Sequence, residues 1–256
     1  MFRGGGKKMS VGIAIVLGIV QGLTEFLPVS SSGHLLFLER IFGIEGDNLA
    51  FNIVVHLGTL FAVIVYYRKR IFEMAKKPFS KDVGLLALSC IPTVIIYFLF
   101  RDFFEDSFSG GALGFAFLVT AAFLVLTTIA MKKCSSEGVD SKTAIMMGVF
   151  QGFAILPGVS RSGSTITAGV VMGKDKEKVA DFSFLMSAPI IVGSLILEIF
   201  GGGFAKVDIL PLIVGFISSF ICGYLAIKFM LDIIRKRSLI WFAIYLVVLG
   251  GVAFFI

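Results

Sequence analysis

Two short polar stretches interrupt an otherwise apolar chain of 256 residues. The first, residues 21–34, reads Gln-Gly-Leu-Thr-Glu-Phe-Leu-Pro-Val-Ser-Ser-Ser-Gly-His, so it brings together a carboxylate, several hydroxyls and an imidazole. The second, residues 151–165, reads Gln-Gly-Phe-Ala-Ile-Leu-Pro-Gly-Val-Ser-Arg-Ser-Gly-Ser-Thr and adds an arginine. Serine with a nearby base is suited to nucleophilic displacement, and arginine beside glycine-rich backbone is suited to binding an oxyanion.

Arg161 is the centre of the predicted anion site. A guanidinium binds a phosphate group bidentately, and the hydroxyls of Ser160, Ser162 and Thr165 can donate hydrogen bonds to the remaining oxygens. A charged side chain at the centre of a bilayer costs at least roughly 2.5 kcal/mol unless it is paired or solvated. A binding role therefore explains this arginine better than a purely structural one.

Glu25, Ser31 and His34 are the candidate catalytic residues of the first stretch. The attacking hydroxyl needs a base and the leaving oxygen needs an acid, and Glu25 or His34 is able to take either role. Ser31 is the favoured nucleophile because the serines on both sides of it have serine counterparts 130 positions later, whereas its own counterpart is Arg161. Ser30 is a candidate for binding phosphate or for capping the helix that follows.

Several of these residues also have structural alternatives. Glu25 could serve only as an ion-pair partner of Arg161. His34 could cap the second half-helix, and Thr165 could act as another N-terminal cap. His56 lies in the apolar run Val-Val-His-Leu-Gly and is interpreted as a core histidine rather than a ligand.

Composition identifies the chain as an all-α integral membrane protein. Hydrophobic residues make up 57% of it and charged residues only 16%, whereas soluble domains average about 45–50% and about 25%. Apolar runs near the roughly 20 residues that a helix needs to cross hydrocarbon predict six transmembrane helices, at residues 49–67, 83–100, 112–131, 182–200, 209–231 and 239–256. The net charge of +6 is small and requires no nucleic-acid partner.

The two polar stretches predict a pair of re-entrant helix–loop–helix hairpins. They lie in segments 11–42 and 144–172, and each segment is divided by a break rich in Pro, Ser and Gly. Irregular backbone at membrane depth is tolerated where it is buried in protein or lines a wet cavity. The matched residues 130 positions apart predict one membrane domain, 1–256, made of two inverted-topology repeats, 11–131 and 144–256.

The charges of the loops predict the orientation of this domain. Basic residues dominate 68–82, 132–143 and 232–238, which places these loops in the cytoplasm, whereas 101–111 is acidic and lies outside. With six crossings, the segment 39–48 also lies outside and the segment 173–178 lies inside. The first hairpin then enters from the outer face and the second from the cytoplasm, so that their polar loops meet.

The residues from Gln21 to His34 resemble the (E/Q)xxxE motif and the following serine–histidine segment of the undecaprenyl-diphosphate phosphatase (bacitracin-resistance) family. Residues 157–165, Pro-Gly-Val-Ser-Arg-Ser-Gly-Ser-Thr, resemble the PGxSRSxxT motif of that family. The resemblance covers essentially the whole chain. It implies a multi-pass enzyme of the plasma membrane that removes the terminal phosphate from a C55 polyprenyl diphosphate at the outer face, which recycles the lipid carrier for cell-wall polymers.

The resemblance also implies roles for individual residues. Gln21 stands where the motif often has glutamate, which implies hydrogen bonding rather than acid–base or metal chemistry. Its partner is the substrate or, since Gln151 matches it 130 positions later, the protein scaffold. A divalent cation, Mg²⁺ or Ca²⁺, is implied as well, with Glu25 as its carboxylate ligand. The partners are then the lipid substrate and the membrane, and a homodimer is compatible with this interpretation. Catalytic or phosphate-binding roles are implied for Glu25, Ser30, Ser31, His34, Ser160, Arg161 and Thr165.

A transporter or flippase is the alternative hypothesis. Inverted repeats with discontinuous helices are common among transporters, and the same anion site could carry a phosphate head group across the membrane. The serine, glutamate and histidine side chains favour hydrolysis, because binding alone requires no nucleophile.

Overall fold

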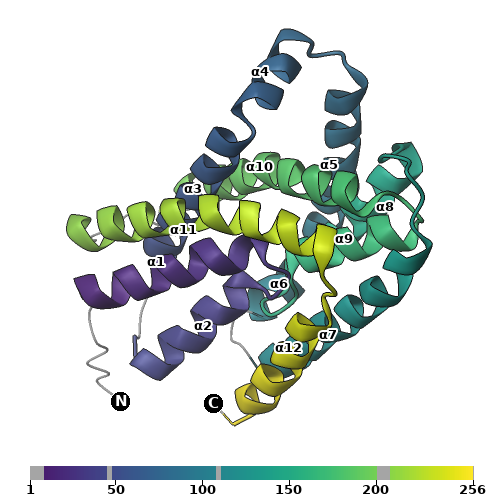
Figure 1. The fold of residues 1–256 in the computed structure, drawn as a ribbon. Helices are drawn as coiled ribbons and strands as arrows, with labels where there is room; N and C mark the ends of the chain where they lie inside the picture. Colours follow the sequence, from purple (N-terminus) through teal and green to yellow (C-terminus); the bar gives the residue numbers. More distant parts are fainter. Residues whose placement is uncertain (1–8, 45–47, 108–110, 201–207, 256) are drawn as a thin grey trace.

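The computed structural model describes residues 9–44, 48–107, 111–200 and 208–255. Within these ranges the chain is helical and contains no strand (Figure 1). The prediction of an all-helical protein is therefore confirmed for the residues described. The elements, in order along the chain, are α1 (Val11–Phe26), α2 (Ser31–Phe42), α3 (Leu49–Tyr66), α4 (Arg68–Lys76), α5 (Lys81–Leu99), α6 (Arg101–Ser107), α7 (Leu113–Ala130), the 3-10 helix η1 (Met131–Lys133), α8 (Ser141–Phe153), α9 (Arg161–Val171), α10 (Lys176–Phe200), α11 (Ile209–Lys236) and α12 (Ile240–Ala253).

Several of these helices are able to cross a membrane. In the described part of the chain, α5, α7 with η1, and α11 are long and apolar enough, and a fourth span results if α3 and α4 are counted as one helix bent by 76°. The apolar helices α1 and α12 are shorter. Over the described residues, each apolar run that the sequence predicted as a crossing lies largely within a helix, and the chain is a multi-pass membrane protein.

Three boundaries differ from the predictions. The second polar segment was expected at 144–172, but α8 begins at Ser141 because the carboxylate of Asp140 accepts a hydrogen bond from the backbone N–H of Thr143 at 2.8 Å. Asp175 caps α10 in the same way through the N–H of Lys178 at 2.9 Å, so α10 starts before the apolar run. The expected loop 68–82 contains helix α4.

Both polar stretches lie between two helices. Each contains a proline, which cannot donate a backbone hydrogen bond and restricts the residue before it. The second helix of each pair then begins at an N-capping serine. Ser30 accepts a hydrogen bond from the N–H of Gly33 at 3.3 Å, and Ser160 accepts one from the N–H of Gly163 at 3.1 Å. The caps of α2 and α9 are thus equivalent, 130 positions apart.

Small residues let each hairpin pack tightly against a long helix. Helix α1 packs on α11, and α8 packs on α5. A Cβ atom on Gly18 would lie 2.6 Å from the carbonyl oxygen of Gly215, and one on Gly22 would lie 2.6 Å from that of Ser219. Gly148 of α8 has equally close backbone contact with α5. Close backbone approach through small residues is a common basis of helix association in membranes.

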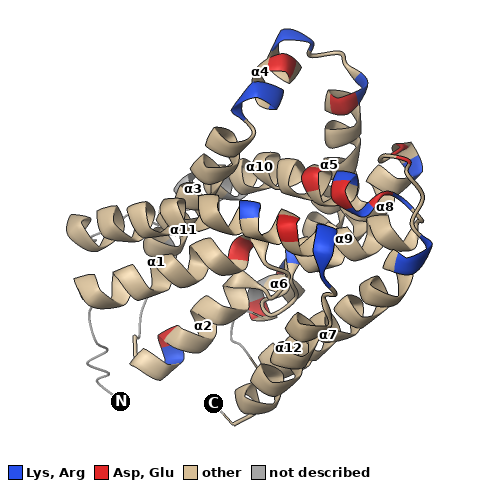
Figure 2. Cartoon of the chain, in the orientation of Figure 1, with Lys and Arg blue, Asp and Glu red and all other residues tan. Residues whose placement is uncertain are grey.

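Ion pairs join the segments that were predicted to be cytoplasmic. Lys174, after α9, pairs with Glu137 at 2.9 Å and with Asp140 at 2.8 Å. Arg235, near the end of α11, pairs with Glu177 at 2.8 Å. The hydrogen bond from Lys174 holds the pKa of Asp140 below its usual range. Figure 2 shows further Lys and Arg residues on α4 and at the start of α5. Residues 45–47 and 108–110, which belong to the segments expected outside, lie beyond the described residues.

We expect Gly18→Ala to destabilise the protein, because the added methyl group would overlap the backbone of α11. Overpacking of this kind costs about 1–3 kcal/mol. Thermal unfolding of the detergent-solubilised protein measures the effect. Gly12→Ala on the same helix is the matched control, because nothing lies within 4 Å of its added Cβ. Equal melting temperatures for the two variants would contradict the role of Gly18 in packing.

Candidate active site

The breaks of the two hairpins lie against each other in the interior of the molecule. The backbone N–H of Gly158 donates to Ser30 Oγ at 3.1 Å, and Ser162 Oγ donates to the carbonyl oxygen of Leu27 at 3.1 Å. A Cβ atom on Gly33 would lie 2.8 Å from the Cα of Gly158, so glycine is required for this approach. Polar side chains that are more than a hundred residues apart in sequence thereby share one site.

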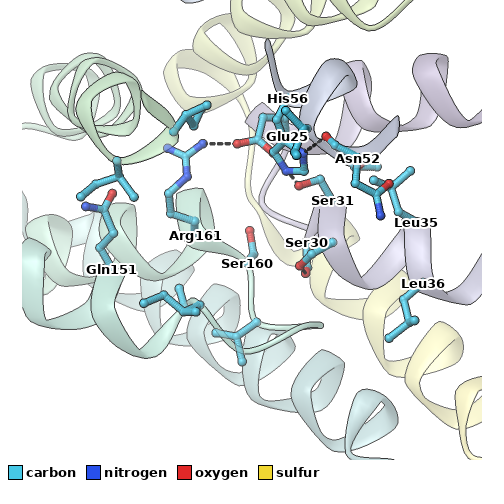
Figure 3. Close-up of a pocket in the computed structure, with 18 of the residues that line it drawn as sticks. Glu25, Ser30, Ser31, Leu35, Leu36, Asn52, His56, Gln151, Ser160 and Arg161 are labelled. Carbon is cyan, nitrogen blue, oxygen red and sulfur yellow. Dashed lines mark hydrogen bonds and ion pairs between the residues drawn. The ribbon is translucent and has the colours of Figure 1, made fainter. Parts of the chain in front are cut away.

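A cavity of about 540 Å³ lies where the hairpins meet (Figure 3). Helices α1, α2 and α3 contribute to its wall from the first half of the chain, and α8, α9 and α10 contribute from the second. Its polar lining includes Glu25, Ser30, Ser31, Ser32, His56, Ser160 and Arg161. Its apolar lining includes Leu35, Leu36, Ile155, Ile190, Ile191 and Leu195.

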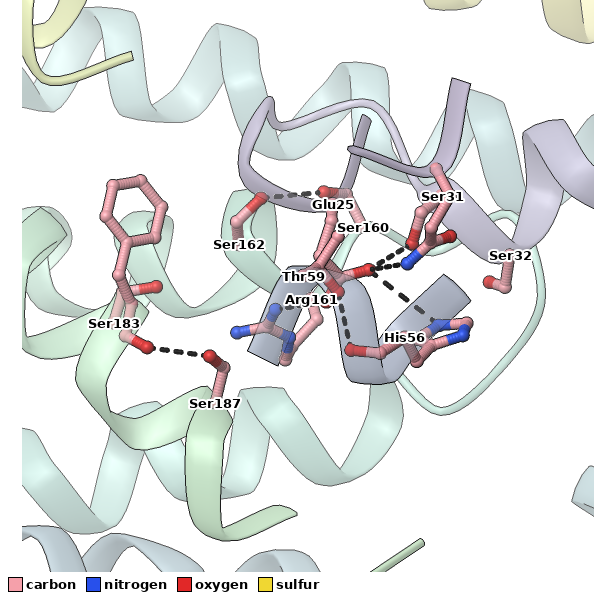
Figure 4. A network of polar contacts seen from close by, with 12 residues as sticks. Glu25, Ser31, Ser32, His56, Thr59, Ser160, Arg161, Ser162, Ser183 and Ser187 are labelled. Atoms are coloured by element: carbon pink, nitrogen blue, oxygen red, sulfur yellow. Dashed lines mark hydrogen bonds and ion pairs between the residues drawn. The ribbon is translucent and has the colours of Figure 1, made fainter. Parts of the chain in front are cut away.

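Glu25, which is 7% exposed, is the centre of the polar network in this wall. Arg161 Nη2 lies 2.5 Å from its Oε1. Its other oxygen, Oε2, accepts hydrogen bonds from Ser31 Oγ at 2.5 Å and from Gln21 Nε2 at 3.0 Å. A buried carboxylate is tolerated when it is paired and hydrogen-bonded, and here partners from α2 and α9 meet both requirements (Figure 4).

Arg161 retains donors for a ligand. Its Nη1 atom is buried and has no hydrogen-bond partner among the described residues, whereas Nη2 is bound to Glu25. The side chain lines the cavity beside Ser160. Arg161 and Ser31 are also the first residues of α9 and α2, so the positive ends of both helices lie at this wall. The arrangement is suited to binding a phosphate group.

The hydroxyls of the first hairpin have different tasks. Ser30 Oγ accepts from two backbone N–H groups, those of Gly33 and Gly158, and is therefore committed to structure. Its φ of +69° is unusual for a residue with a side chain, and such strain is typical of functional sites. Ser31 Oγ instead faces the cavity and donates to Glu25. This geometry favours Ser31 as the nucleophile, with Glu25 as the base that accepts its proton.

His34, a predicted catalytic residue, does not join this cluster. Its Nδ1 lies 2.7 Å from the carbonyl oxygen of Ser30, and its Nε2 lies 2.7 Å from the hydroxyl of Tyr245. Residues 31, 32, 35, 36 and 39 form the cavity face of α2. Because an α-helix rotates by about 100° per residue, His34 falls on the flank of this face and packs toward α7 and α12.

Three predicted phosphate-binding residues lie behind the cavity wall rather than in it. The Thr165 hydroxyl is bonded to Ser183 Oγ at 2.6 Å, and Ser162 is bonded to Leu27. Gln21 reaches the site only through Glu25. These three side chains hold α9 and the carboxylate of Glu25 in place. The other predicted binding residues, Ser30, Ser160 and Arg161, line the cavity.

His56 belongs to the site, although its sequence context indicated a core residue. It lines the cavity from α3, and its Nε2 lies 3.8 Å from Glu25 Oε2. Its Nδ1 lies 2.7 Å from the carbonyl oxygen of Asn52. One feature of the sequence could have indicated that His56 faces a polar site. Asn52 and His56 are two polar residues one turn apart on an otherwise apolar helix.

The described residues alone do not form a divalent-cation site at Glu25. Both carboxylate oxygens already have partners, and the guanidinium of Arg161 holds the position that a cation would take. Mg²⁺ and Ca²⁺ need several oxygen ligands, yet the described residues contain no cluster of three or more His, Cys, Asp or Glu side chains able to hold a metal. No step of the mechanism below is assigned to a metal.

The fold and the site together define a class of protein. It is a helical membrane protein with a buried arginine, carboxylate and serine arranged to bind and attack an anionic group. The sequence matches the family described as "Bacitracin resistance protein BacA" over residues 14–252, and the chain belongs to this family.

Relatives with high identity span nearly the whole chain. An "Undecaprenyl-diphosphatase" of Carboxydothermus hydrogenoformans is 44% identical over 246 residues, which cover 93% of this chain and 94% of the relative. An "Undecaprenyl-diphosphatase 4" of Bacillus cereus is 42% identical, with 93% of each chain covered. An "Undecaprenyl-diphosphatase" of Bacteroides fragilis is 44% identical over 93% of this chain and 95% of its own.

We expect Glu25→Gln to destabilise the protein strongly, because it leaves the charge of Arg161 buried without a partner. Breaking a buried ion pair in this way costs about 3–5 kcal/mol. The double variant Glu25→Gln/Arg161→Gln should lose less stability than the sum of the single variants.

Thermal or denaturant unfolding in detergent measures this coupling. The control is the exposed pair of Glu177 and Arg235, where Glu177→Gln should change little. Strictly additive losses at Glu25 and Arg161 would show that their ion pair does not stabilise the fold.

Proposed function

We propose that the protein is a hydrolase that converts undecaprenyl diphosphate to undecaprenyl monophosphate and phosphate. The observation that carries this proposal is the cavity in which the unpartnered donor of Arg161 lies beside the bonded pair of Ser31 and Glu25. The names of the relatives support the choice of substrate. Recycling of this lipid carrier would serve the synthesis of peptidoglycan and other cell-envelope polymers.

In the proposed reaction, the terminal phosphate binds at Arg161 and at the N-termini of α2 and α9. Ser31 Oγ attacks the terminal phosphorus, and its proton passes to Glu25 Oε2. The bond between that phosphorus and the bridging oxygen breaks, and the bridging oxygen leaves on the prenyl monophosphate. Phosphoryl transfer requires chiefly positioning and neutralisation of charge. As the guanidinium turns toward the phosphate, Glu25 loses part of its counter-charge and becomes a stronger base.

The apolar side of the cavity suits the lipid part of the substrate. Ile190, Ile191 and Leu195 of α10 line the same cavity as the polar groups of α2. A cavity of about 540 Å³ is in the range of small-molecule sites, roughly 300–1,000 Å³. We propose that it holds the diphosphate and the first isoprene units, while the rest of the prenyl chain extends into the bilayer.

The proposal includes the full membrane layout. We propose six crossings and two re-entrant hairpins in inverted orientation, in the plasma membrane, with the cavity accessible from the outer face. The equivalent caps Ser30 and Ser160 support the repeat. The linked basic segments around Lys174 and Arg235 support a common cytoplasmic side. The requirement for Mg²⁺ or Ca²⁺ stays a prediction.

The flippase alternative finds no support in the comparisons, since the relatives described above are all named as diphosphatases. The direct hydrogen bond between Ser31 and Glu25 also has no purpose in simple head-group binding. Hydrolysis is therefore the function that we propose.

We expect the purified protein to release phosphate from a C55 or shorter prenyl diphosphate, and Ser31→Ala to abolish this release. Arg161→Lys should lower kcat by about 10²–10³, which is typical for the loss of one transition-state contact. Ser32→Ala is the matched control and should retain activity within a few fold, because Ser32 makes no hydrogen bond with Glu25. Full activity in Ser31→Ala would contradict the role of Ser31 as the nucleophile. A wild-type protein that releases no phosphate would contradict the proposed hydrolase function.

A further inference from the structure

Only one of the two histidines in the chain lines the cavity. Both ring nitrogens of His34 already have partners, the carbonyl oxygen of Ser30 and the hydroxyl of Tyr245, and His34 does not line the cavity. His56 has one nitrogen bound and the other directed toward the site, and its side chain is 29% exposed. An imidazole in this position is able to exchange a proton with the solvent of the cavity.

The protonation of the neutral His56 ring follows from its contacts. The carbonyl oxygen of Asn52 can only accept a hydrogen bond, so Nδ1, at 2.7 Å from it, carries the proton. Nε2 then presents a lone pair toward Glu25 Oε2. The distance of 3.8 Å between these two atoms is too long for a hydrogen bond, so Nε2 is available to accept a hydrogen bond from a water molecule in the cavity.

The reaction proposed above needs a second base. Glu25 takes the proton of Ser31 in the first step, and the departing prenyl monophosphate is a stable anion that does not need this proton. Glu25 is therefore protonated when the serine is phosphorylated. It can return the proton to Ser31 Oγ, but it cannot also deprotonate the water that must attack the phosphoserine.

We propose that His56 is the general base of the second half-reaction, an inference that rests on the proposed function. His56 Nε2 removes a proton from a water molecule, whose oxygen forms a bond to the phosphorus. The bond between phosphorus and Ser31 Oγ breaks, and Glu25 gives its proton to that oxygen. Inorganic phosphate leaves, and the imidazolium returns its proton to solvent. Ser31 Oγ at 2.5 Å and His56 Nε2 at 3.8 Å both adjoin Glu25 Oε2, so the nucleophile and the proposed base lie on the same carboxylate oxygen at the cavity wall.

The charges of the site are consistent with Glu25 as the base of the first step and His56 as the base of the second. The positive charge that forms on His56 is stabilised by Glu25 after the carboxyl group has released its proton. Arg161 remains available to the phosphoryl group through Nη1. Each group therefore performs one task in each step.

The test uses the full-length protein in detergent and a prenyl diphosphate labelled with ³²P in the terminal phosphate. His56→Gln should release prenyl monophosphate in a burst of about one equivalent per protein molecule. Phosphate release should be slowed by about 10²–10⁴, the usual contribution of a general base. The label should remain on the acid-quenched protein, and peptide mass spectrometry should place it on Ser31. Ser31→Ala should show neither burst nor label.

A second variant separates chemistry from folding. His56→Ala with added imidazole should recover phosphate release and lose the protein-bound label. Slow turnover of His56→Gln without labelled protein would overturn the role of His56, as would wild-type rates. Wild-type protein that hydrolyses no prenyl diphosphate at all would instead overturn the proposed function, so the two failures are distinguishable.

Discussion

The ion pair between Glu25 and Arg161 is the interaction on which the site depends. Its partners are 136 positions apart, and both are largely removed from solvent. Two charges at this depth are stable only when they meet with good geometry. The pair therefore requires both hairpins to be docked, and it holds the arginine where an incoming phosphate can compete for it. This ion pair stabilises the site before substrate binds. In the proposed reaction, Arg161 gives up part of its contact with Glu25 for contact with the phosphate.

Contacts that involve the backbone of both hairpins hold Glu25 and Arg161 at the distance of an ion pair. Ser30 joins its own helix to the opposite hairpin through Gly158, and Gly33 allows the two loops to touch. The strained φ of Ser30 is maintained because its hydroxyl and its carbonyl are both engaged. The scaffold fixes the start of α2, where the reactive hydroxyl of Ser31 lies, and this rigidity explains why neighbouring serines have such different roles.

Sequence alone predicted the helical membrane fold and the elements that carry the site, because apolar runs and polar breaks are local features. It also predicted that Glu25, Ser31 and Arg161 share one site, and the structure brings them together. It did not predict which of the two histidines lines the cavity, since the direction of a side chain depends on how its helix is rotated against its neighbours. His56 looked like a core residue because nothing near it in sequence reveals that a carboxylate arrives from α1. His34 looked catalytic because it closes the run Ser-Ser-Ser-Gly-His that follows the proline break.

The first residue of α2 is a serine and the first residue of α9 is an arginine, although the two helices begin with equivalent caps. Two identical copies of this hairpin, associated as a symmetric dimer, would place the same side chain at both positions. A pair of serines would lack the cation, and a pair of arginines would lack the nucleophile. A single chain that contains both hairpins is free of this constraint, since each hairpin then carries its own residue at that position. Asymmetry at one matched position thus distinguishes a catalyst from a symmetric scaffold.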